Sequence, residues 1–397
     1  MKRTQAEATN IKATLTPKRR FPEFQDDSGW NLLPLKCACQ MQAGKFVQAA
    51  DIFEKPTDGL FPCYGGNGLR GYTKTFTHSG KYPLIGRQGA LCGNVKLADG
   101  DFHATEHAVV ASARGGINVD WLFHTLELSN LNQYATGQAQ PGVSVEVLEK
   151  VSIAVPPKES EQQKIAECLS TLDELIGFEN QKLDALKAHK KGLMQQLFPR
   201  EGETLPRLRF QEFQDAPEWE EKEVGEIFNV TRGQVLAMPR VSDKKTQSTP
   251  YPVYSSQTKQ SGRCGFYSDF LFEDAITWTT DGANAGDVNF RSGKFYCTNV
   301  CGVLLSSEGY ANPCIAAVIN SVARKHVSYV GNPKLMNGVM AKIVIPFPSV
   351  AEQQRVASCL SSLDDLIATQ SDQIEVLKTH KKGLMQQLFP SQAEAAA

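Results

Sequence analysis

The segment His103–His107 has the spacing of a zinc-hydrolase motif, His-x-x-Glu-His. In that motif one helix turns both imidazoles toward a metal ion and places the carboxylate beside it as a base. Here Phe102 precedes the segment and Val109 follows it, a composition that favours a strand over a helix. We therefore predict no metal site, and a metal hydrolase built on these three side chains stays an alternative.

The other patterns with catalytic or cofactor spacing are equally weak. Gly66–Gly71 fits Gly-x-Gly-x-x-Gly, but no strand–helix–strand unit surrounds it, so we expect a loop. The pairs Cys37/Cys39 and Cys297/Cys301 lack further ligands at zinc spacing. No phosphate-binding loop of the Gly-x-x-x-x-Gly-Lys-Ser/Thr type occurs. The sequence therefore predicts a chain without catalytic residues, metal or cofactor.

The chain has 397 residues, of which 41% are hydrophobic and 21% charged, values typical of two or three globular domains. Its formal net charge of −1 argues against general binding of polyanions, although it allows a local basic face. No apolar run is long enough to span a membrane, and ten scattered cysteines do not form a disulfide framework. These features, together with the lack of a secretory signal, predict a cytoplasmic protein without membrane contact.

Two stretches of 39 residues, Glu161–Pro199 and Glu352–Pro390, are copies of one another and agree at 24 positions. A shorter pair precedes them: RFPEFQDDSGW begins at Arg20 and RFQEFQDAPEW begins at Arg209. Between these markers the two halves keep only sparse matches, at an offset of 193 residues, such as Gly89 with Gly282 and Val95 with Val288. The chain is therefore an internal repeat, with a variable segment and a nearly invariant segment in each half.

The invariant stretches predict two long helices that pack on each other. Apolar residues recur at steps of three, four or seven, which is a heptad seam. Each copy ends in Phe-Pro, which stops a helix, and a helix of about 39 residues is ~58 Å long. A parallel pair would need a connection that doubles back along this length, so we predict an antiparallel pair. A generic hairpin and a parallel homodimer are the alternatives. In the first copy the seam residues are Ile165, Leu169, Leu172, Ile176, Leu183, Leu186, Leu193 and Leu197.

The variable segments have mixed composition, with more strand than helix. We therefore predict an α+β fold in which two globular domains are joined by two long antiparallel coiled-coil helices, with pseudo-twofold internal symmetry. Strands are expected at 109–111, 151–155, 278–280, 296–298, 303–305 and 343–345, and short helices at 119–128 and 313–322. The expected boundaries are 1–19 for an N-terminal extension, 20–157 and 200–348 for the globular domains, 158–199 and 349–390 for the helical regions, and 391–397 for a tail.

The order of these segments resembles the specificity subunit of type I restriction–modification systems. The markers are the Arg-Phe-x-Glu-Phe opening of each half, the proline-rich strand before Glu-Gln-Gln, and the helix end Lys-Lys-Gly-Leu-Met-Gln-Gln-Leu-Phe-Pro. After Trp30 the first opening reads Asn-Leu-Leu-Pro, which departs from the acidic continuation found after Trp219. The resemblance extends from Pro17 to Pro390.

The resemblance implies a non-catalytic subunit that selects DNA. In that family each of two target-recognition domains reads one half of a split target in the major groove of double-stranded DNA, and the helices fix the spacer. The subunit binds two methyltransferase subunits and, for restriction, two translocase-nuclease subunits. Two unlike recognition domains imply an asymmetric target. A structural coiled-coil adaptor that binds only proteins is the alternative from another functional class.

The resemblance directs the search for DNA contacts to polar, glycine-containing loops present in both halves. Arginine can read guanine, and asparagine or glutamine can read adenine, whereas lysine more often contacts phosphate. Ordinary surface turns are the alternative for every candidate. In the first half the candidates are Arg70, Lys74, Arg87, Gln88, Gly89 and Asn94. In the second half they are Ser255, Gln257, Lys259, Arg263, Gly282, Asn284 and Arg291.

Charge does not favour strong DNA binding by the isolated chain. Residues 20–150 carry 11 Lys/Arg and 13 Asp/Glu, and residues 209–345 carry 14 of each. We therefore expect much of the phosphate contact to come from the methyltransferase subunits. The lysine pairs near the two helix ends are candidates for binding these partners: Lys190, Lys191, Lys381 and Lys382.

Overall fold

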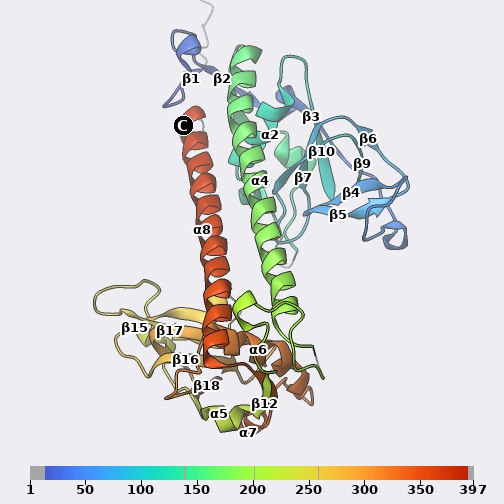
Figure 1. The fold of residues 1–397 in the computed structure, drawn as a ribbon. Coiled ribbons are helices and arrows are strands. Elements are labelled where there is room, and N and C mark those ends of the chain that lie inside the picture. The colour runs from blue at the N-terminus through green and yellow to red at the C-terminus, as the bar shows by residue number, and fades with distance from the viewer. Residues whose placement is uncertain (1–13, 138–139, 201, 258, 392–397) are drawn as a thin grey trace, which may run out of the picture. The chain divides into compact units, whose positions relative to one another are not determined.

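A computed structural model describes residues 14–137, 140–200, 202–257 and 259–391 (Figure 1). The chain divides into two compact units. Unit 1 comprises the described residues of Met1–Asn180 and Gln373–Ala397, and unit 2 comprises those of Gln181–Asp372. In the described ranges, no helix is both long and apolar enough to cross a membrane. Most of the predicted N-terminal extension (1–13) and of the predicted tail (392–397) lies outside the described residues.

The two long helices form where the repeated segments predict them. Helix α4 spans Glu159–Leu197 and helix α8 spans Val350–Leu388, with 39 residues each. The eight seam residues of α4 and the eight residues 191 positions further along the chain, in α8, are all buried or half-buried. Each helix ends directly before Phe-Pro, because proline cannot continue a helix. The heptad pattern was therefore sufficient to locate both helices.

The helices run antiparallel, as predicted. In unit 1 the Lys381 ammonium of α8 lies 2.7 Å from the Asp173 carboxylate of α4. In unit 2 the Lys190 ammonium of α4 lies 2.5 Å from the Asp364 carboxylate of α8. The first half of α4 thus pairs with the last half of α8, and the last half of α4 pairs with the first half of α8.

Unit 1 contains a four-stranded sheet in the order β3-β10-β7-β8, with helix α2 packed against it (Figure 1). A second sheet has the order β5-β4-β9-β6, and a third has the order β1-β2-β11. Strand β1 lies inside the segment that was expected to precede the first domain. The strands are β1 (Thr14–Leu15), β2 (Trp30–Pro34), β3 (Cys39–Ala43), β4 (Phe61–Gly65), β5 (Gly68–Thr73), β6 (His78–Ser79), β7 (Tyr82–Gly86), β8 (Val95–Ala98), β9 (Asp101–Ala104), β10 (Ala108–Ala113) and β11 (Ser152–Val155). The short helices are α1 (Leu35–Ala38), α2 (Val119–Leu128) and α3 (Val145–Leu148).

Unit 2 contains a six-stranded sheet in the order β13-β18-β16-β17-β14-β15 and a two-stranded sheet of β12 and β19. Helix α6 packs against β17 (Figure 1). The strands are β12 (Glu220–Glu223), β13 (Asn229–Arg232), β14 (Tyr251–Tyr254), β15 (Arg263–Tyr267), β16 (Phe272–Thr279), β17 (Val288–Cys297), β18 (Cys301–Leu305) and β19 (Val344–Phe347). The short helices are α5 (Val224–Ile227), α6 (Pro313–Ala323) and α7 (Asn337–Ala341).

The predicted short elements form with small changes at their ends. Helix α2 has the predicted bounds, and α6 extends one residue beyond its predicted end. The strands expected at 109–111, 151–155, 303–305 and 343–345 fall on β10, β11, β18 and β19. The stretches 278–280 and 296–298 are only the ends of the longer strands β16 and β17. Local composition therefore located the elements better than it delimited them.

Each domain contains one parallel pair of neighbouring strands. Strand β4 runs parallel to β9, and β14 runs parallel to β17, although most neighbouring strands are antiparallel. Beside each parallel pair, a glycine brings the backbone of another segment close to the backbone of one of the two strands. A Cβ on Gly44 would lie 2.2 Å from the Ala104 carbonyl oxygen, and one on Gly233 would lie 2.1 Å from the Cys297 carbonyl oxygen. Only glycine fits at these two positions.

The repeated opening and the Glu-Gln-Gln motif are two sides of one contact. Arg20 Nε and Nη2 each donate to Glu161 at 2.7 Å, and Arg209 Nε and Nη2 donate to Glu352 at 2.8 and 2.7 Å. All four side chains are less than a tenth exposed. The paired, charge-assisted geometry is the strong form of a salt bridge. It fastens the start of each long helix to the start of the domain that precedes it.

The first glutamine of each motif also has a structural task. The Gln162 side-chain oxygen accepts from the Asn118 backbone N–H at 2.9 Å, and the Gln353 side-chain oxygen accepts from Asn312 Nδ2 at 2.9 Å. Asn118 and Asn312 are the N-cap residues of α2 and α6. A capping side chain satisfies helix N–H groups that have no partner within the helix. The motif therefore also orients the domain helix against the long helix.

Each helix end packs into the domain of the other repeat. Leu388 and Phe389, at the end of α8, belong to the buried core of unit 1, where the Phe389 ring lies 5.9 Å from the Trp30 ring. Leu197 and Phe198, at the end of α4, belong to the core of unit 2. Both copies of the helix end are therefore core residues, which is a physical reason for their identity.

Candidate nucleic-acid interface

Unit 1 has a hollow of about 470 Å³ between the β4–β5 hairpin and the loop after β7, here called hollow 1. The hairpin turn contributes mostly glycine, so part of the wall is bare main chain. Guanidinium, carboxamide and imidazole groups complete the wall, and groups of these types can bond to base edges and phosphates. The residues that line it are Gly65, Gly66, Asn67, Gly68, Leu69, Arg70, Gln88, Gly89, His107 and Gln140.

Three predicted DNA-binding residues of unit 1 meet in hollow 1: Arg70, Gln88 and Gly89. The Arg70 and Gln88 side chains are exposed. Arg87 adjoins them and is half-buried, and its backbone N–H donates to the His107 carbonyl at 2.9 Å. The backbone of this loop is thus fixed while two of its polar side chains stay accessible.

The other two candidates of unit 1 lie outside the hollow. Lys74 is exposed, and its ammonium lies 5.9 Å from the centre of the Phe53 ring. Asn94 is exposed in the turn before β8, and its carbonyl accepts from the Gly86 N–H at 2.9 Å. The sequence placed both residues in the right region of the fold but not at the hollow.

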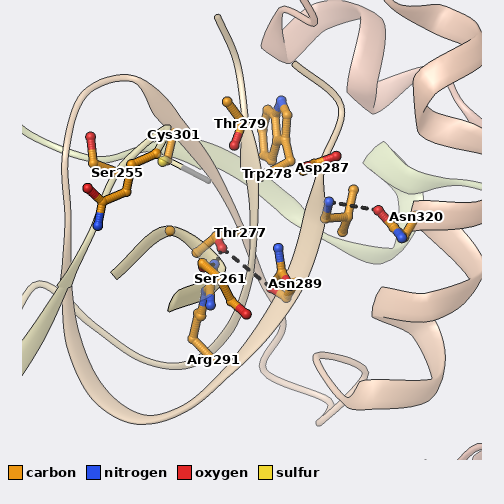
Figure 2. A pocket seen from close by; sticks show the side chains of 13 residues that line it. Ser255, Ser261, Thr277, Trp278, Thr279, Asp287, Asn289, Arg291, Cys301 and Asn320 are labelled. Atoms are coloured by element: carbon orange, nitrogen blue, oxygen red, sulfur yellow. Dashed lines mark hydrogen bonds between the residues drawn. The ribbon is translucent and has the colours of Figure 1, made fainter. Parts of the chain in front are cut away.

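Unit 2 has a hollow of about 310 Å³, here called hollow 2, between the β14–β15 connection and strands β16 and β17 (Figure 2). Hydroxyl and carboxamide groups form much of its wall, with one arginine among them. The residues that line it are Ser255, Gln257, Ser261, Gly262, Thr277, Trp278, Thr279, Asp287, Val288, Asn289, Arg291, Cys301 and Asn320.

The predicted serine and glutamine of unit 2 line hollow 2, and both form internal hydrogen bonds. Ser255 Oγ accepts from Thr298 Oγ1 at 2.9 Å, and Gln257 Nε2 donates to the Arg263 carbonyl. The Arg263 guanidinium donates to Gln260 and lies 5.2 Å from a phenylalanine ring centre. These contacts hold the β14–β15 connection in one conformation.

The remaining candidates of this loop region have mixed positions. Asn284 Nδ2 donates to the Ser256 carbonyl at 3.0 Å, so Asn284 tethers the loop. Gly282 has a positive φ of 93° and would accept a Cβ without a clash. The side chain of Lys259 lies outside the described part of the chain. None of these three residues lines hollow 2 in the described structure.

Arg291 requires a correction to the sequence interpretation, which treated it as a surface side chain able to read a base. It is only 8% exposed. Its Nε donates to Thr277 Oγ1 at 3.0 Å, and its Nη2 donates to the Ser261 carbonyl at 2.7 Å. The guanidinium also stacks on the Tyr254 ring, 3.9 Å from the ring centre. Burial lowers the pKa of this group. Its Nη2 holds the β14–β15 connection at Ser261, and its Nε contacts strand β16 at Thr277.

The two hollows occupy corresponding places in the two domains. Gly89 follows β7 and Gly282 follows β16, with φ values of 88° and 93°. The Gly89 N–H donates to the Pro141 carbonyl at 2.9 Å, and the Gly282 N–H donates to the Pro333 carbonyl at the same distance. A second loop therefore braces each hollow through one backbone hydrogen bond. The glycine matches in the sequence pointed to this shared geometry.

Sequence reasoning missed several wall residues. His107 and Gln140 line hollow 1, and Thr277 and Asn289 line hollow 2. His107 had been considered only as part of a metal motif. Gln140 and Asn289 lie far along the chain from the hairpin turns they face, so no local pattern joins them. Correspondence between the two halves was the only available signal, and it fades in these segments.

The metal-like motif adopts a strand and turn instead of a helix. His103 lies on β9, where its Nδ1 is 3.2 Å from Thr75 Oγ1 and its Nε2 is 3.2 Å from the Lys45 carbonyl. Neither ring nitrogen is directed at His107. Among the residues with described positions, no three His, Cys, Asp or Glu side chains form a metal-binding group.

The lysines proposed to bind partners divide into two types. Lys191 and Lys382 are exposed. Lys190 contacts Asp364 at 2.5 Å, and Lys381 is only 9% exposed between two carboxylates. An exposed lysine can reach a partner, whereas Lys190 and Lys381 are already engaged by carboxylates of the same chain. Lys191 and Lys382 are therefore the better candidates for partner binding, which stays a prediction.

Comparison with known proteins identifies the family. The model described as "Type I restriction modification DNA specificity domain" matches residues 28–188 and 217–379. Over 137 residues the chain is 50% identical to the Type I restriction enzyme EcoprrI specificity subunit of Escherichia coli, which covers 34% of each protein. It is 31% identical over 147 residues to the Type I restriction enzyme MpnII specificity subunit of Mycoplasma pneumoniae, covering 36% of this chain and 43% of the relative. These alignments thus span less than half of either relative.

Solved structures share the fold over nearly the full length. The S subunit of a type I restriction–modification system from M. genitalium aligns with 95% of this chain and 100% of its own, with a TM-score of 0.70 and 18% identity. A chain from a study of complex assembly and conformational transition in the type I system aligns with 94% of this chain and 99% of its own, with a TM-score of 0.51 and 14% identity. The family model matches one domain in each half of the repeat, which agrees with a fold of two domains and two antiparallel helices. The chain therefore belongs to the type I restriction–modification DNA specificity family.

Proposed function

We propose that this chain is a non-catalytic, sequence-specific DNA-binding subunit whose two domains each read one half of a bipartite, asymmetric target. The observation that carries the proposal is the pair of hollows. They occupy corresponding places in two domains of the same fold, but their walls carry different polar groups. Different donors and acceptors at equivalent positions select different bases. Two domains that differ in this way favour two unlike half-sites over a palindrome.

The long helices supply the second part of the proposal, the spacer. Both helices take part in both units, and each is fastened to a domain by a buried arginine–glutamate pair. A continuous helix resists bending and cannot change length without losing hydrogen bonds. We infer that the helix pair sets the number of unread base pairs between the half-sites.

The proposed partners are double-stranded DNA, two methyltransferase subunits and two translocase-nuclease subunits. Near-neutral domain charge supports the need for a partner, because phosphate neutralisation dominates DNA affinity. The exposed Lys191 and Lys382 are the positions we assign to methyltransferase docking. Changing both to glutamate should weaken co-purification with the methyltransferase, while Lys182→Glu and Lys378→Glu, on the same helices, serve as controls.

An adaptor that binds only proteins is the competing function. The test is a pull-down of a random-sequence DNA library with the chain and its co-expressed methyltransferase, followed by sequencing of the bound DNA. We expect enrichment of one split motif, and loss of one half of that motif with Arg70→Ala. Recovery of DNA without any enriched sequence, in the presence of an intact protein complex, would favour the adaptor.

A further inference from the structure

Hollow 2 contains a buried positive charge without a buried negative partner. The Arg291 side chain is 8% exposed, and its described partners are a hydroxyl group, a carbonyl group and an aromatic ring. No carboxylate of the described residues forms an ion pair with it. A buried guanidinium without a counter-charge is costly in free energy. Two explanations fit such a group: a bound anion supplies the missing negative charge, or the folded protein is stable enough despite the unpaired charge.

The unused part of this guanidinium belongs to the hollow. Nε and Nη2 are engaged by Thr277 and Ser261, whereas Nη1 has no hydrogen-bond partner among the described residues. Figure 2 shows Arg291 beside Thr277 and Ser261 among the residues that line the hollow. The guanidinium therefore offers a free donor edge in a space of about 310 Å³. That volume is at the lower limit of small-molecule sites.

The other wall groups suit a polar anion. Hydroxyl groups from Ser255, Ser261 and Thr279 can donate hydrogen bonds to an anion, whereas the Thr277 hydroxyl already donates to the Asn289 carbonyl at 3.4 Å. Asp287 is the acidic residue of the described wall, and it is already paired with Arg324, whose Nε lies 3.0 Å from its Oδ1. The negative charge of Asp287 is thus neutralised by Arg324, which does not line the hollow. The positive charge of Arg291 has no carboxylate partner among the described residues of the wall.

The loop above the guanidinium is held in an uncommon conformation. Gln260 and Ser261 have φ values of 51° and 52°, in the left-handed region. Two consecutive non-glycine residues there store strain, which persists where surrounding contacts enforce it. The Arg291–Ser261 hydrogen bond is one of those contacts. The same arginine therefore both shapes the loop and faces the cavity.

Unit 1 provides an internal contrast. The residue that corresponds to Arg291 is Ala98, which is fully buried in an apolar cluster. Arg70 in hollow 1 is exposed to solvent instead. A shared need of the fold for a buried arginine is therefore excluded, because the same fold is built without one in unit 1.

We propose that hollow 2 is a phosphate-binding site, with Arg291 Nη1 and the surrounding hydroxyl groups as donors. An arginine fork and hydroxyl donors are well suited to phosphate oxygens. Two sources share this chemistry: a backbone phosphate of bound DNA and the phosphate of a free nucleotide. The first source rests on the proposed DNA-binding function, and the second does not.

The first experiment titrates the full-length chain with inorganic phosphate and with dAMP by calorimetry, at constant ionic strength set with chloride. We expect saturable binding that weakens at least tenfold in Arg291→Met. Arg240→Met is the matched control, because Arg240 also stacks on a tyrosine ring, 5.3 Å from its centre, but does not line the hollow. Arg291→Lys keeps the charge without the fork and should bind with intermediate affinity.

The second experiment distinguishes the sources. The chain with its methyltransferase binds a target duplex in which single phosphates are replaced by neutral methylphosphonates. If DNA supplies the phosphate, one replacement weakens binding by the native chain at least fivefold and has no effect on Arg291→Met. If a free nucleotide is the ligand, dAMP binds and no replacement depends on Arg291.

The proposal is overturned if the native chain binds neither phosphate nor dAMP and no replacement shows dependence on Arg291. That result is independent of the folding of any variant for the first two ligands. Failure of the DNA-binding proposal alone would appear differently, as absence of a selected DNA sequence with phosphate binding intact.

Discussion

The two units differ where the long helices meet the domain helices. In unit 1 Lys381 lies between Glu127 and Asp173, at 3.0 and 2.7 Å, and the buried His124 adjoins them. In unit 2 the corresponding Lys190 contacts only one carboxylate among the described residues. The pair on the long helices is thus shared, and the additional groups come from α2.

The difference arises from two positions of the domain helix. His124 and Glu127 of α2 correspond to Val318 and Ser321 of α6, counted from the asparagine caps. Val318 is buried and apolar, so unit 2 packs a hydrophobic contact where unit 1 builds a charged cluster. The comparison shows that the lysine–aspartate contact between the long helices is common to both units, whereas each domain packs its own helix against them with different side chains.

The contact that both units share should give the largest effect. Glu161→Leu and Glu352→Leu each leave a buried guanidinium unpaired, which costs ~3–5 kcal/mol of unfolding free energy. The loss should be about 1 kcal/mol larger for Glu161→Leu, since Trp30 Nε1 also donates to Glu161, at 3.2 Å. Urea unfolding followed by tryptophan fluorescence measures both. Glu159→Leu, at an exposed site on the same helix, is the control, and losses equal to the control would contradict the shared-contact account.

The charged cluster of unit 1 should give the next largest effect. Lys381→Met leaves two carboxylates without their cation and should lower the unfolding free energy by about 2 kcal/mol. Lys190→Met removes a more exposed pair and should cost less than about 1 kcal/mol. Thermal unfolding of the two variants makes the comparison directly. Equal shifts in melting temperature would show that the extra groups of unit 1 add nothing.

The smallest expected difference between the units is in how their unfolding free energy depends on pH. Burial raises the pKa of Glu127, but His124 and Lys381 outweigh it and lower that pKa to about 2. A carboxyl with a lowered pKa stabilises the fold above its unfolded value, near 4.5, and loses this contribution as the pH falls toward 2. Because its side chain is 41% exposed, we expect only about 1 kcal/mol. In unfolding experiments between pH 5 and 2, Glu127→Gln should reduce the acid sensitivity, and an unchanged pH profile would reject the prediction.

Much of the fold could be predicted because its signals are local or repeated. The seam residues of α4 and α8 repeat within one helix, and Phe-Pro marks both ends. The domain helices begin at asparagine caps that a sequence displays directly. By contrast, the burial of Lys381 depends on α2, which is distant in the chain. A helix pattern alone places that lysine at a gap in the seam and cannot supply its carboxylate partners.

The candidate site was only half predictable for the same reason. Glycine matches between the halves located the loops around Gly89 and Gly282. The burial of Arg291 was not accessible, because its partners Thr277 and Ser261 lie on other segments of the chain and no local pattern joins them to it. The walls of both hollows also come from several distant segments, which only the folded chain brings together.

The most direct test of the central claim is methylation-sensitive sequencing of a genome in cells that express this chain with its methyltransferase. Two unlike domains on one helix pair predict a single methylated motif with two specified parts of different sequence and an unread gap of fixed length. Replacing residues 20–157 with the matching domain of another family member should change one part and leave the other part and the gap unchanged. A continuous or palindromic motif, or a change in both parts after that replacement, would contradict the account.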